Sequence, residues 1–218
     1  MDKRQDSEPP GTVAILDYGM GNLRSVEKAF EHVGVRAVLT SDHGIAREAD
    51  GVILPGVGAF PRAMSRIREL GLDELIDERR EAGVPILGIC LGLQLLFEST
   101  VELGGDTGLG VLGGGVADLR AEGLKVPHIG WAPVRWERNS ALTDGIDTET
   151  PFYFVHSFVP EAGPDETLGT AVYGERFVCA AESDNVYGVQ FHPEKSSTAG
   201  LRLLQNFASI CAAAPAAA

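Results

Sequence analysis

Cysteine is scarce in this chain, and no group of cysteines suggests a cross-link. The three cysteines, Cys90, Cys179 and Cys211, are spread over 218 residues. An odd and sparse set does not make a disulfide framework, and no cysteine or histidine cluster has the spacing of zinc ligands. We therefore expect a cytoplasmic protein without disulfides and without a bound metal.

Basic residues and long apolar runs are also in short supply. The chain has 18 lysines and arginines against 31 acidic residues, which gives a formal net charge of −13. An acidic surface argues against nucleic acid or an anionic membrane as the main partner. No apolar run approaches the roughly 20 residues that a membrane-spanning helix needs. The polar stretch at residues 1–10 also lacks the apolar centre of a signal peptide. The sequence therefore predicts a protein that binds neither nucleic acid nor membranes.

The first half of the chain has the pattern of an α/β fold. Apolar strand patterns at residues 12–17, 35–40, 51–54 and 84–89 alternate with helical patterns. Val26, Ala29, Phe30 and Val33 mark the first helix, and residues 61–70 and 72–82 form two more, separated at Gly71. Such alternation is typical of an open, mostly parallel sheet flanked by helices.

The second half contains mainly short strand patterns. They occur at residues 116–119, 131–136, 152–155, 169–173, 177–181 and 186–191, and a helical pattern follows at 197–211. Residues 104–115 are glycine-rich and predict a loop with a short strand. We expect a small antiparallel or mixed extension of the sheet and not a second domain. The predicted organisation is a disordered tail at 1–11, one domain at 12–211, and a frayed tail at 212–218.

A cysteine between two glycines follows the strand predicted at 84–89. The stretch is Gly88-Ile-Cys-Leu-Gly92, and Leu93, Leu96 and Phe97 continue it at helical spacing. This pattern is typical of a nucleophile elbow, a sharp strand-to-helix turn in which the glycines permit close approach. A helix N-terminus next to a thiol also favours its reactive form. The alternative is a small buried cysteine without a chemical role.

A histidine and a glutamate follow the last predicted strand. Residues 186–191 lead directly into His192-Pro-Glu194. In an extended chain residues i and i+2 point to the same side, and Pro193 keeps His192 out of the helical region. His192 could then take a proton from a thiol while Glu194 orients the imidazole. The alternative is a capping histidine and a solvated glutamate.

Two glycine loops also follow predicted strands. Pro55-Gly-Val-Gly-Ala-Phe60 can present bare backbone N–H groups, which makes it a candidate oxyanion hole for a reaction at Cys90. An ordinary turn before a helix is the alternative. Gly19 and Gly21 follow the first strand, but Ser25-Val26 stand where a dinucleotide-binding loop needs its third glycine. We therefore do not expect a nucleotide there.

The motifs together resemble a known family. Gly88-x-Cys90-x-Gly92-x-Gln94 and His192-Pro-Glu194 are similar to the motifs of class I (triad) glutamine amidotransferases. Five stretches resemble one branch of that family, the glutaminase subunits of imidazole glycerol phosphate synthase, and the likeness extends from about Val13 to Phe207. They are Asp17-Tyr-Gly-Met-Gly-Asn-Leu-Arg-Ser25, Pro55-Gly-Val-Gly-Ala-Phe60, Pro127-His-Ile-Gly-Trp131, Phe152-Tyr-Phe-Val-His-Ser157 and His192-Pro-Glu-Lys-Ser196.

The resemblance implies an activity and a set of residues. It implies the class I glutamine amidotransferase fold and hydrolysis of L-glutamine to glutamate and ammonia through a thioester, with no cofactor. The implied catalytic residues are Cys90, His192 and Glu194. The implied oxyanion and substrate-binding residues are Gly56, Val57, Gly58, Leu91, Gln94, His156, Ser157 and Phe158. The implied partner is a (β/α)8 cyclase subunit in a heterodimer, which uses the ammonia in histidine biosynthesis to make imidazole glycerol phosphate and aminoimidazole carboxamide ribotide. Asn22, Trp131 and Lys195 are the implied interface residues.

Two positions depart from the family pattern. Ala132 stands where the family usually has asparagine, and Phe158 where it usually has tyrosine. From the residues alone, His156 could also be a core histidine and Trp131 a core aromatic. Two other functions compete with the amidotransferase hypothesis: a Cys-His-Glu hydrolase of another substrate, and a regulatory subunit without activity.

Overall fold

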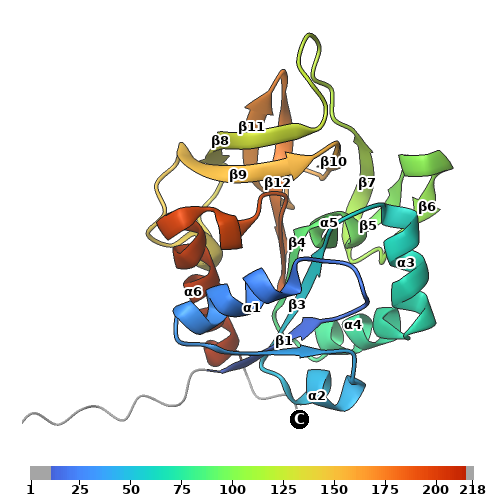
Figure 1. The fold of residues 1–218 in the computed structure, drawn as a ribbon. Coiled ribbons are helices and arrows are strands. Elements are labelled where there is room, and N and C mark those ends of the chain that lie inside the picture. Colours follow the sequence, from blue (N-terminus) through green and yellow to red (C-terminus); the bar gives the residue numbers. More distant parts are fainter. Residues whose placement is uncertain (1–10, 215–218) are drawn as a thin grey trace, which may run out of the picture.

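A nine-stranded sheet forms the centre of the molecule (Figure 1). The computed structural model describes residues 11–214. The strand order is β2-β1-β3-β4-β13-β12-β11-β8-β9. The strands are β1 (Thr12–Leu16), β2 (Arg36–Thr40), β3 (Gly51–Gly56), β4 (Ile86–Cys90), β8 (His128–Trp136), β9 (Thr150–His156), β11 (Thr167–Tyr173), β12 (Glu175–Ser183) and β13 (Val186–Val189).

The sheet has a parallel half and an antiparallel half. The neighbours from β2 to β13 pair in parallel, and those from β13 to β9 pair antiparallel. This confirms the prediction of an open parallel sheet with an antiparallel extension. Parallel strands place their carboxyl ends at one edge, where open α/β sheets bind their ligands. β4 and β13 are neighbours in this half, so the residues that follow them emerge side by side.

Helices cover both faces of the parallel half. They are α1 (Leu23–His32), α2 (His43–Glu48), α3 (Phe60–Glu69), α4 (Leu72–Glu81), α5 (Leu91–Leu95) and α6 (Ser197–Ala213). Val13 and Ile15 of β1 pack in the core cluster with α1 and α6, whereas Ala14 and Leu16 pack in the cluster with α3 and α4. The alternation along one strand thus divides the core into two layers. In Figure 1, α1 and α6 lie together on one side of the sheet, away from α3 and α4.

A second, four-stranded sheet was not predicted. Its order is β10-β7-β5-β6, with β5 (Phe97–Thr100), β6 (Asp106–Thr107), β7 (Leu112–Asp118) and β10 (Phe158–Glu161). Most of the strand predicted at 116–119 belongs to β7 and pairs with β10, not with the main sheet. Three short 3-10 helices complete the described elements: η1 (Glu102–Gly104), η2 (Ala141–Thr143) and η3 (Pro193–Lys195).

The elbow helix is shorter than its apolar spacing predicted. α5 ends at Leu95, and Phe97 begins β5 instead of continuing the helix. Leu93, Leu96 and Phe97 still pack in one core cluster. Burial alone therefore could not distinguish a longer helix from a helix followed by a strand. Pairing of β5 with β7 ends the helix.

The predicted tails fall largely outside the described residues. Of the tail predicted at 1–11, only Gly11 is described, and residues 215–218 lie outside as well. α6 continues to Ala213, two residues beyond the end predicted at Cys211, so the start of the predicted frayed tail is helical. No helix within residues 11–214 combines the length and the apolar character needed to cross a lipid bilayer.

Candidate active site

Cys90 occupies a strained backbone position at the end of β4. Its φ is 56° and its ψ is −110°, a conformation that non-glycine residues rarely adopt. A side chain at position 92 would place its Cβ 1.7 Å from the carbonyl oxygen of Leu54 on β3. One at position 88 would place its Cβ 2.7 Å from the oxygen of Gly92. The predicted elbow is therefore present, and its glycines allow strand and helix to pack backbone to backbone.

His192 lies beside Cys90 because β13 pairs with β4. Val189 is the register partner of Ile89, and the chain reaches His192 three residues later. The backbone N–H of His192 donates to the oxygen of Tyr153 at 2.9 Å, and the hydroxyl of Ser196 donates to the oxygen of His192 at 2.6 Å. These two bonds hold the backbone of His192 from both sides.

Glu194 binds the far side of the imidazole. His192 Nδ1 donates to Glu194 Oε1 at 2.9 Å, and the Glu194 side chain is only 1% exposed. The contact forms although Pro193, Glu194 and Lys195 make one turn of 3-10 helix and not the extended chain that was predicted. Burial by itself lowers the pKa of His192, but its interactions with Cys90 and Glu194 raise it to about 9. The imidazole is therefore protonated at neutral pH.

A hollow of about 270 Å³ opens above Cys90. Cys90, His192 and Lys195 line it. So do most of the residues predicted from the sequence to bind the substrate or the oxyanion: Val57, Gly58, Leu91, Gln94, His156, Ser157 and Phe158. Gly56 is absent from the lining but is the register partner of Cys90 across β3 and β4.

The glycine loop after β3 is held from the side of Tyr18. The Tyr18 hydroxyl donates to the oxygen of Pro55 at 2.6 Å, and burial together with nearby Cys90 raises the pKa of Tyr18. A Cβ at Gly56 would lie 2.3 Å from that hydroxyl oxygen. Gly58 has φ 108°, which strains any other residue. The loop therefore requires glycine at both positions.

Three polar residues near the hollow were not assigned a role from the sequence. Gln190 is fully buried and donates to Cys90 Sγ through Nε2 at 3.8 Å. His128 is buried, and its Nδ1 lies 3.2 Å from Nε2 of His156. Glu102 lines the hollow and accepts from the backbone N–H of Phe60 at 2.8 Å. The signal for Gln190 was an amide at the end of an otherwise apolar strand.

The structure decides whether His156 is a core histidine and whether Trp131 is a core aromatic. His156 is buried, with Nδ1 bonded to the oxygen of Phe158 at 3.0 Å, so it is a satisfied core histidine that also lines the hollow. Trp131 is 53% exposed, so the interpretation as a core aromatic was wrong. Asn22 is likewise exposed and Lys195 is at the mouth of the hollow. Asn22 and Trp131 do not line it.

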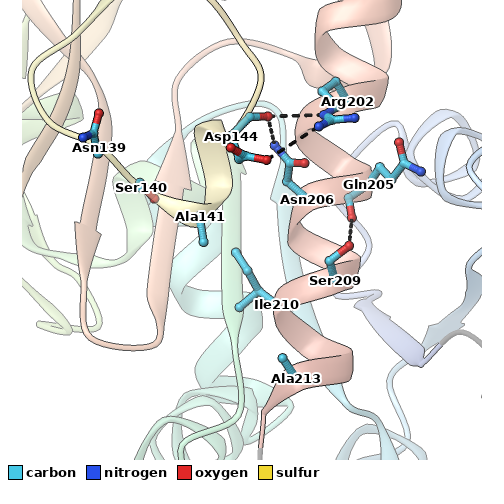
Figure 2. Close-up of a pocket in the computed structure, with 10 residues that line it drawn as sticks. All are labelled: Asn139, Ser140, Ala141, Asp144, Arg202, Gln205, Asn206, Ser209, Ile210 and Ala213. Atoms are coloured by element: carbon cyan, nitrogen blue, oxygen red, sulfur yellow. Dashed lines mark hydrogen bonds and ion pairs between the residues drawn. The ribbon is translucent and has the colours of Figure 1, made fainter.

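A larger hollow lies elsewhere in the molecule. It has about 710 Å³ and opens between α6 and the segment around η2 (Figure 2). Most of the residues that line it are of polar type, and Arg202 and Asp144 form an ion pair at 3.6 Å. No cysteine or histidine lines it. We therefore take the smaller hollow, which contains Cys90 and His192, as the candidate active site.

Comparison with known proteins yields one family. The family "Glutamine amidotransferase class-I" matches residues 14–211. The chain is 51% identical over 199 residues to "Imidazole glycerol phosphate synthase subunit HisH" of Moorella thermoacetica, covering 91% of this chain and 94% of that protein. It is 50% identical over 198 residues to the subunit of the same name from Aquifex aeolicus, covering 88% and 94%.

Solved structures show the same fold at low identity. A structure described as a glutamine amidotransferase matches with a TM-score of 0.74 at 23% identity, over 93% of this chain and 100% of that one. A chain in the structure of PurLQS from Thermotoga maritima matches with a TM-score of 0.71 at 21% identity, over 92% and 99%. These structures support the fold alone.

Proposed function

Because the chain belongs to the class I glutamine amidotransferases, and among them to the HisH subunits of imidazole glycerol phosphate synthase, we propose that it hydrolyses L-glutamine and supplies the ammonia to a cyclase subunit in histidine biosynthesis. One observation carries the proposal: Cys90 at a strained elbow lines one hollow together with His192, and Glu194 holds Nδ1 of that histidine from behind.

The first half of the reaction forms a thioester. The proton of the Cys90 thiol resides on His192, so the sulfur attacks as the thiolate. It forms a bond to the side-chain carbonyl carbon of glutamine, and the C–N bond then breaks. His192, which is protonated at neutral pH, gives its proton to the departing nitrogen, so ammonia leaves and the imidazole becomes neutral. Glu194 holds Nδ1, which leaves Nε2 to serve the sulfur and the leaving group.

The second half releases glutamate. Neutral His192 takes a proton from water, the water oxygen attacks the thioester carbon, and the C–S bond breaks to restore Cys90. Backbone N–H groups of Gly56, Val57, Gly58 and Leu91 are the proposed donors to the negative oxygen in both steps. Losing one donor of this kind typically costs roughly a hundredfold or more in rate.

The lining of the hollow suits an amino acid amide. Glutamine carries an ammonium and a carboxylate at one end and a carboxamide at the other. Glu102 supplies a negative charge for the ammonium, and Gln94 supplies a side-chain amide that can form a hydrogen bond with the substrate. His156, Ser157 and Phe158 form the facing wall. At neutral pH His156 is uncharged because burial lowers its pKa to about 4.

The ammonia must reach its acceptor before it is protonated, because ammonium is not nucleophilic. A docked (β/α)8 cyclase subunit meets this need, with Asn22, Trp131 and Lys195 as proposed contacts. Trp131 projects from β8 with half of its surface exposed, and its ring contacts the ring of Tyr153 edge-on, at 5.8 Å between ring centroids. An exposed tryptophan of this kind is a typical anchor for a partner.

The proposal is tested by measuring glutamate release from glutamine in three mixtures: the chain alone, the chain with a cyclase subunit, and both with the ribotide substrate of the cyclase. We expect a large rise in the last mixture. Strong release by the chain alone would support the chemistry but not the coupling. No release in any mixture would refute the proposed substrate.

A further inference from the structure

Gln190 lies at the centre of a buried network of hydrogen-bonded side chains behind the candidate active site. It directly follows β13 and is completely buried. Its two amide atoms contact two different residues of the site: Oε1 lies 2.9 Å from Gln94 Nε2, and Nε2 lies 3.8 Å from Cys90 Sγ. A buried amide without partners destabilises the folded protein, so these contacts determine how the side chain lies.

The backbone carbonyl of Phe158 determines which atom donates in each hydrogen bond of this network. The oxygen of Phe158 can only accept, and two groups reach it at 3.0 Å: Gln94 Nε2 and His156 Nδ1. The Gln94 atom must therefore be its nitrogen. Its second hydrogen then donates to Gln190 Oε1, which leaves Gln190 Nε2 to donate toward the sulfur of Cys90.

The two histidines of the network can be assigned donor and acceptor atoms in the same way. Since His156 Nδ1 donates to Phe158, its Nε2 accepts in the neutral ring. His128 Nδ1, 3.2 Å away, is then the donor to that atom. Burial lowers the pKa of His128 as well, and its ring is stacked on Tyr173 at 4.0 Å between centroids. Both imidazoles are thus held as neutral rings with defined tautomers.

We propose that Gln190 is a positioning residue with two separable effects, an inference that rests on the proposed glutaminase function. Gln190 accepts one amide hydrogen of Gln94, and the oxygen of Phe158 accepts the other. Gln94 therefore presents only its acceptor atom, Oε1, to the hollow. That atom selects an N–H group of the substrate. By donating toward Cys90, the Gln190 side chain orients the sulfur and stabilises its anionic form.

Two substitutions separate these effects. Gln190→Leu removes both contacts at similar volume. Gln190→Glu keeps an acceptor for Gln94 but replaces the donor near Cys90 with an oxygen. Val189→Ala is the matched control, because it removes buried volume at the neighbouring position and leaves every hydrogen bond of the network in place.

Two readouts are measured on each full-length variant. The first is KM and kcat for glutamine with the cyclase partner and its ribotide ligand. The second is the rate of Cys90 alkylation by iodoacetamide from about pH 5 to about pH 10, located by peptide mass spectrometry, which needs neither glutamine nor a partner. We expect KM to rise about tenfold in Gln190→Leu and less in Gln190→Glu, since a lost neutral hydrogen bond in a pocket has about this effect.

In the rate of Cys90 alkylation at neutral pH, we expect the two Gln190 variants to rank in the opposite order. We expect it to fall about tenfold or more in Gln190→Glu, with the profile moved to higher pH, and to fall less in Gln190→Leu, because the new carboxylate places a like charge beside the thiolate whereas leucine only removes the donor. Val189→Ala stays within about twofold of the unsubstituted protein in both readouts, because the Val189 side chain packs in the apolar core and makes none of these polar contacts.

The two orders distinguish positioning from mere structure, since a folding defect moves both readouts together. The inference is wrong if both Gln190 variants match Val189→Ala. It is also wrong if KM and alkylation change in the same order across the two variants. If the unsubstituted protein fails to hydrolyse glutamine under all conditions, the proposed function fails, and the alkylation profiles still decide whether Gln190 acts on Cys90.

Discussion

Gly56 and Cys90 are direct register partners at the carboxyl ends of β3 and β4. The pairing brings the glycine loop and the nucleophile candidate to the same point of the sheet edge, although 33 residues of chain lie between these two positions. A Cβ at position 56 would also lie 3.1 Å from the Cβ of Leu91, the residue after Cys90. The strand pairing, the elbow and the loop therefore depend on one another.

Replacing Cys90 with serine should abolish the proposed activity without unfolding the protein. A hydroxyl is a far poorer nucleophile than a thiol in a site built around sulfur, so we expect glutamate release to fall roughly a thousandfold or more. The measurement is coupled glutamate release with the cyclase subunit. Cys179→Ala, a change at another buried cysteine on β12, is the control and should keep most of the activity. Equal rates in Cys90→Ser and the control would remove Cys90 from the mechanism.

Replacing Gly56 with alanine should destabilise the site through the hydroxyl of Tyr18. The added Cβ meets Tyr18 Oη at 2.3 Å, and overpacking of this kind costs about 1–3 kcal/mol. Tyr18→Phe alone loses the bond to Pro55, worth about 1 kcal/mol. Urea unfolding of both variants and the double variant gives the coupling. We expect the double variant to lose less stability than the sum, and an additive result would contradict the predicted clash.

Stability should fall at alkaline pH through His192. Its pKa is raised from 6.5 to about 9 in the folded protein, so its contribution is fully present below pH 6.5 and is lost as the pH rises through about 9. The loss is on the order of 3 kcal/mol at most. The free energy of unfolding should be measured by urea titration from about pH 6 to about pH 10. Glu194→Gln removes one cause of the shift and should flatten the decline. An unchanged slope would exclude the ion pair as its source.

Stability should change with the opposite sign through His156. Burial lowers its pKa from 6.5 to about 4, so the unfolded chain binds a proton in a range where the folded protein does not. Stability attributable to His156 is therefore lost as the pH falls from 6.5 toward 4. The difference in unfolding free energy between the unsubstituted protein and His156→Gln isolates this part, because carboxylates titrate in both. A difference that does not vary with pH would contradict a buried neutral His156.

Removing the Trp131 side chain should weaken association and leave the fold intact. Since the ring is half exposed, Trp131→Ala should change unfolding stability by about 0.5 kcal/mol or less. An interface anchor typically contributes about 2 kcal/mol or more to binding, so we expect the Kd for the cyclase subunit to rise about thirtyfold. Ile45→Ala, at an exposed apolar residue on α2 at the other end of the molecule in Figure 1, is the control. Equal Kd values for both variants would place the interface elsewhere.

The sequence by itself determined the parts of this protein that depend on short-range backbone geometry. Glycines at 88 and 92 around Cys90 identified the elbow because the turn needs close approach on both sides, and the pattern is visible within five residues. His192 and Glu194 were predicted to meet as residues i and i+2 of an extended chain, and they do meet, although the chain forms a 3-10 turn there. Short apolar runs and helical spacing also sufficed for the strands of the parallel half and for α1, α3 and α4, whereas α2 was not predicted.

Only the tertiary structure decided the rest. Gln190 touches Gln94 and Cys90, which lie 96 and 100 positions away in the sequence, and no local pattern marks such a contact. α5 ends at Leu95, and the residues that follow form β5 and pair with β7, a strand more than ten residues further along the chain. Trp131 is exposed because β8 presents that side of the strand to solvent. In each case the outcome depends on packing between segments that are distant in sequence, whereas propensity and periodicity describe only neighbours along the chain.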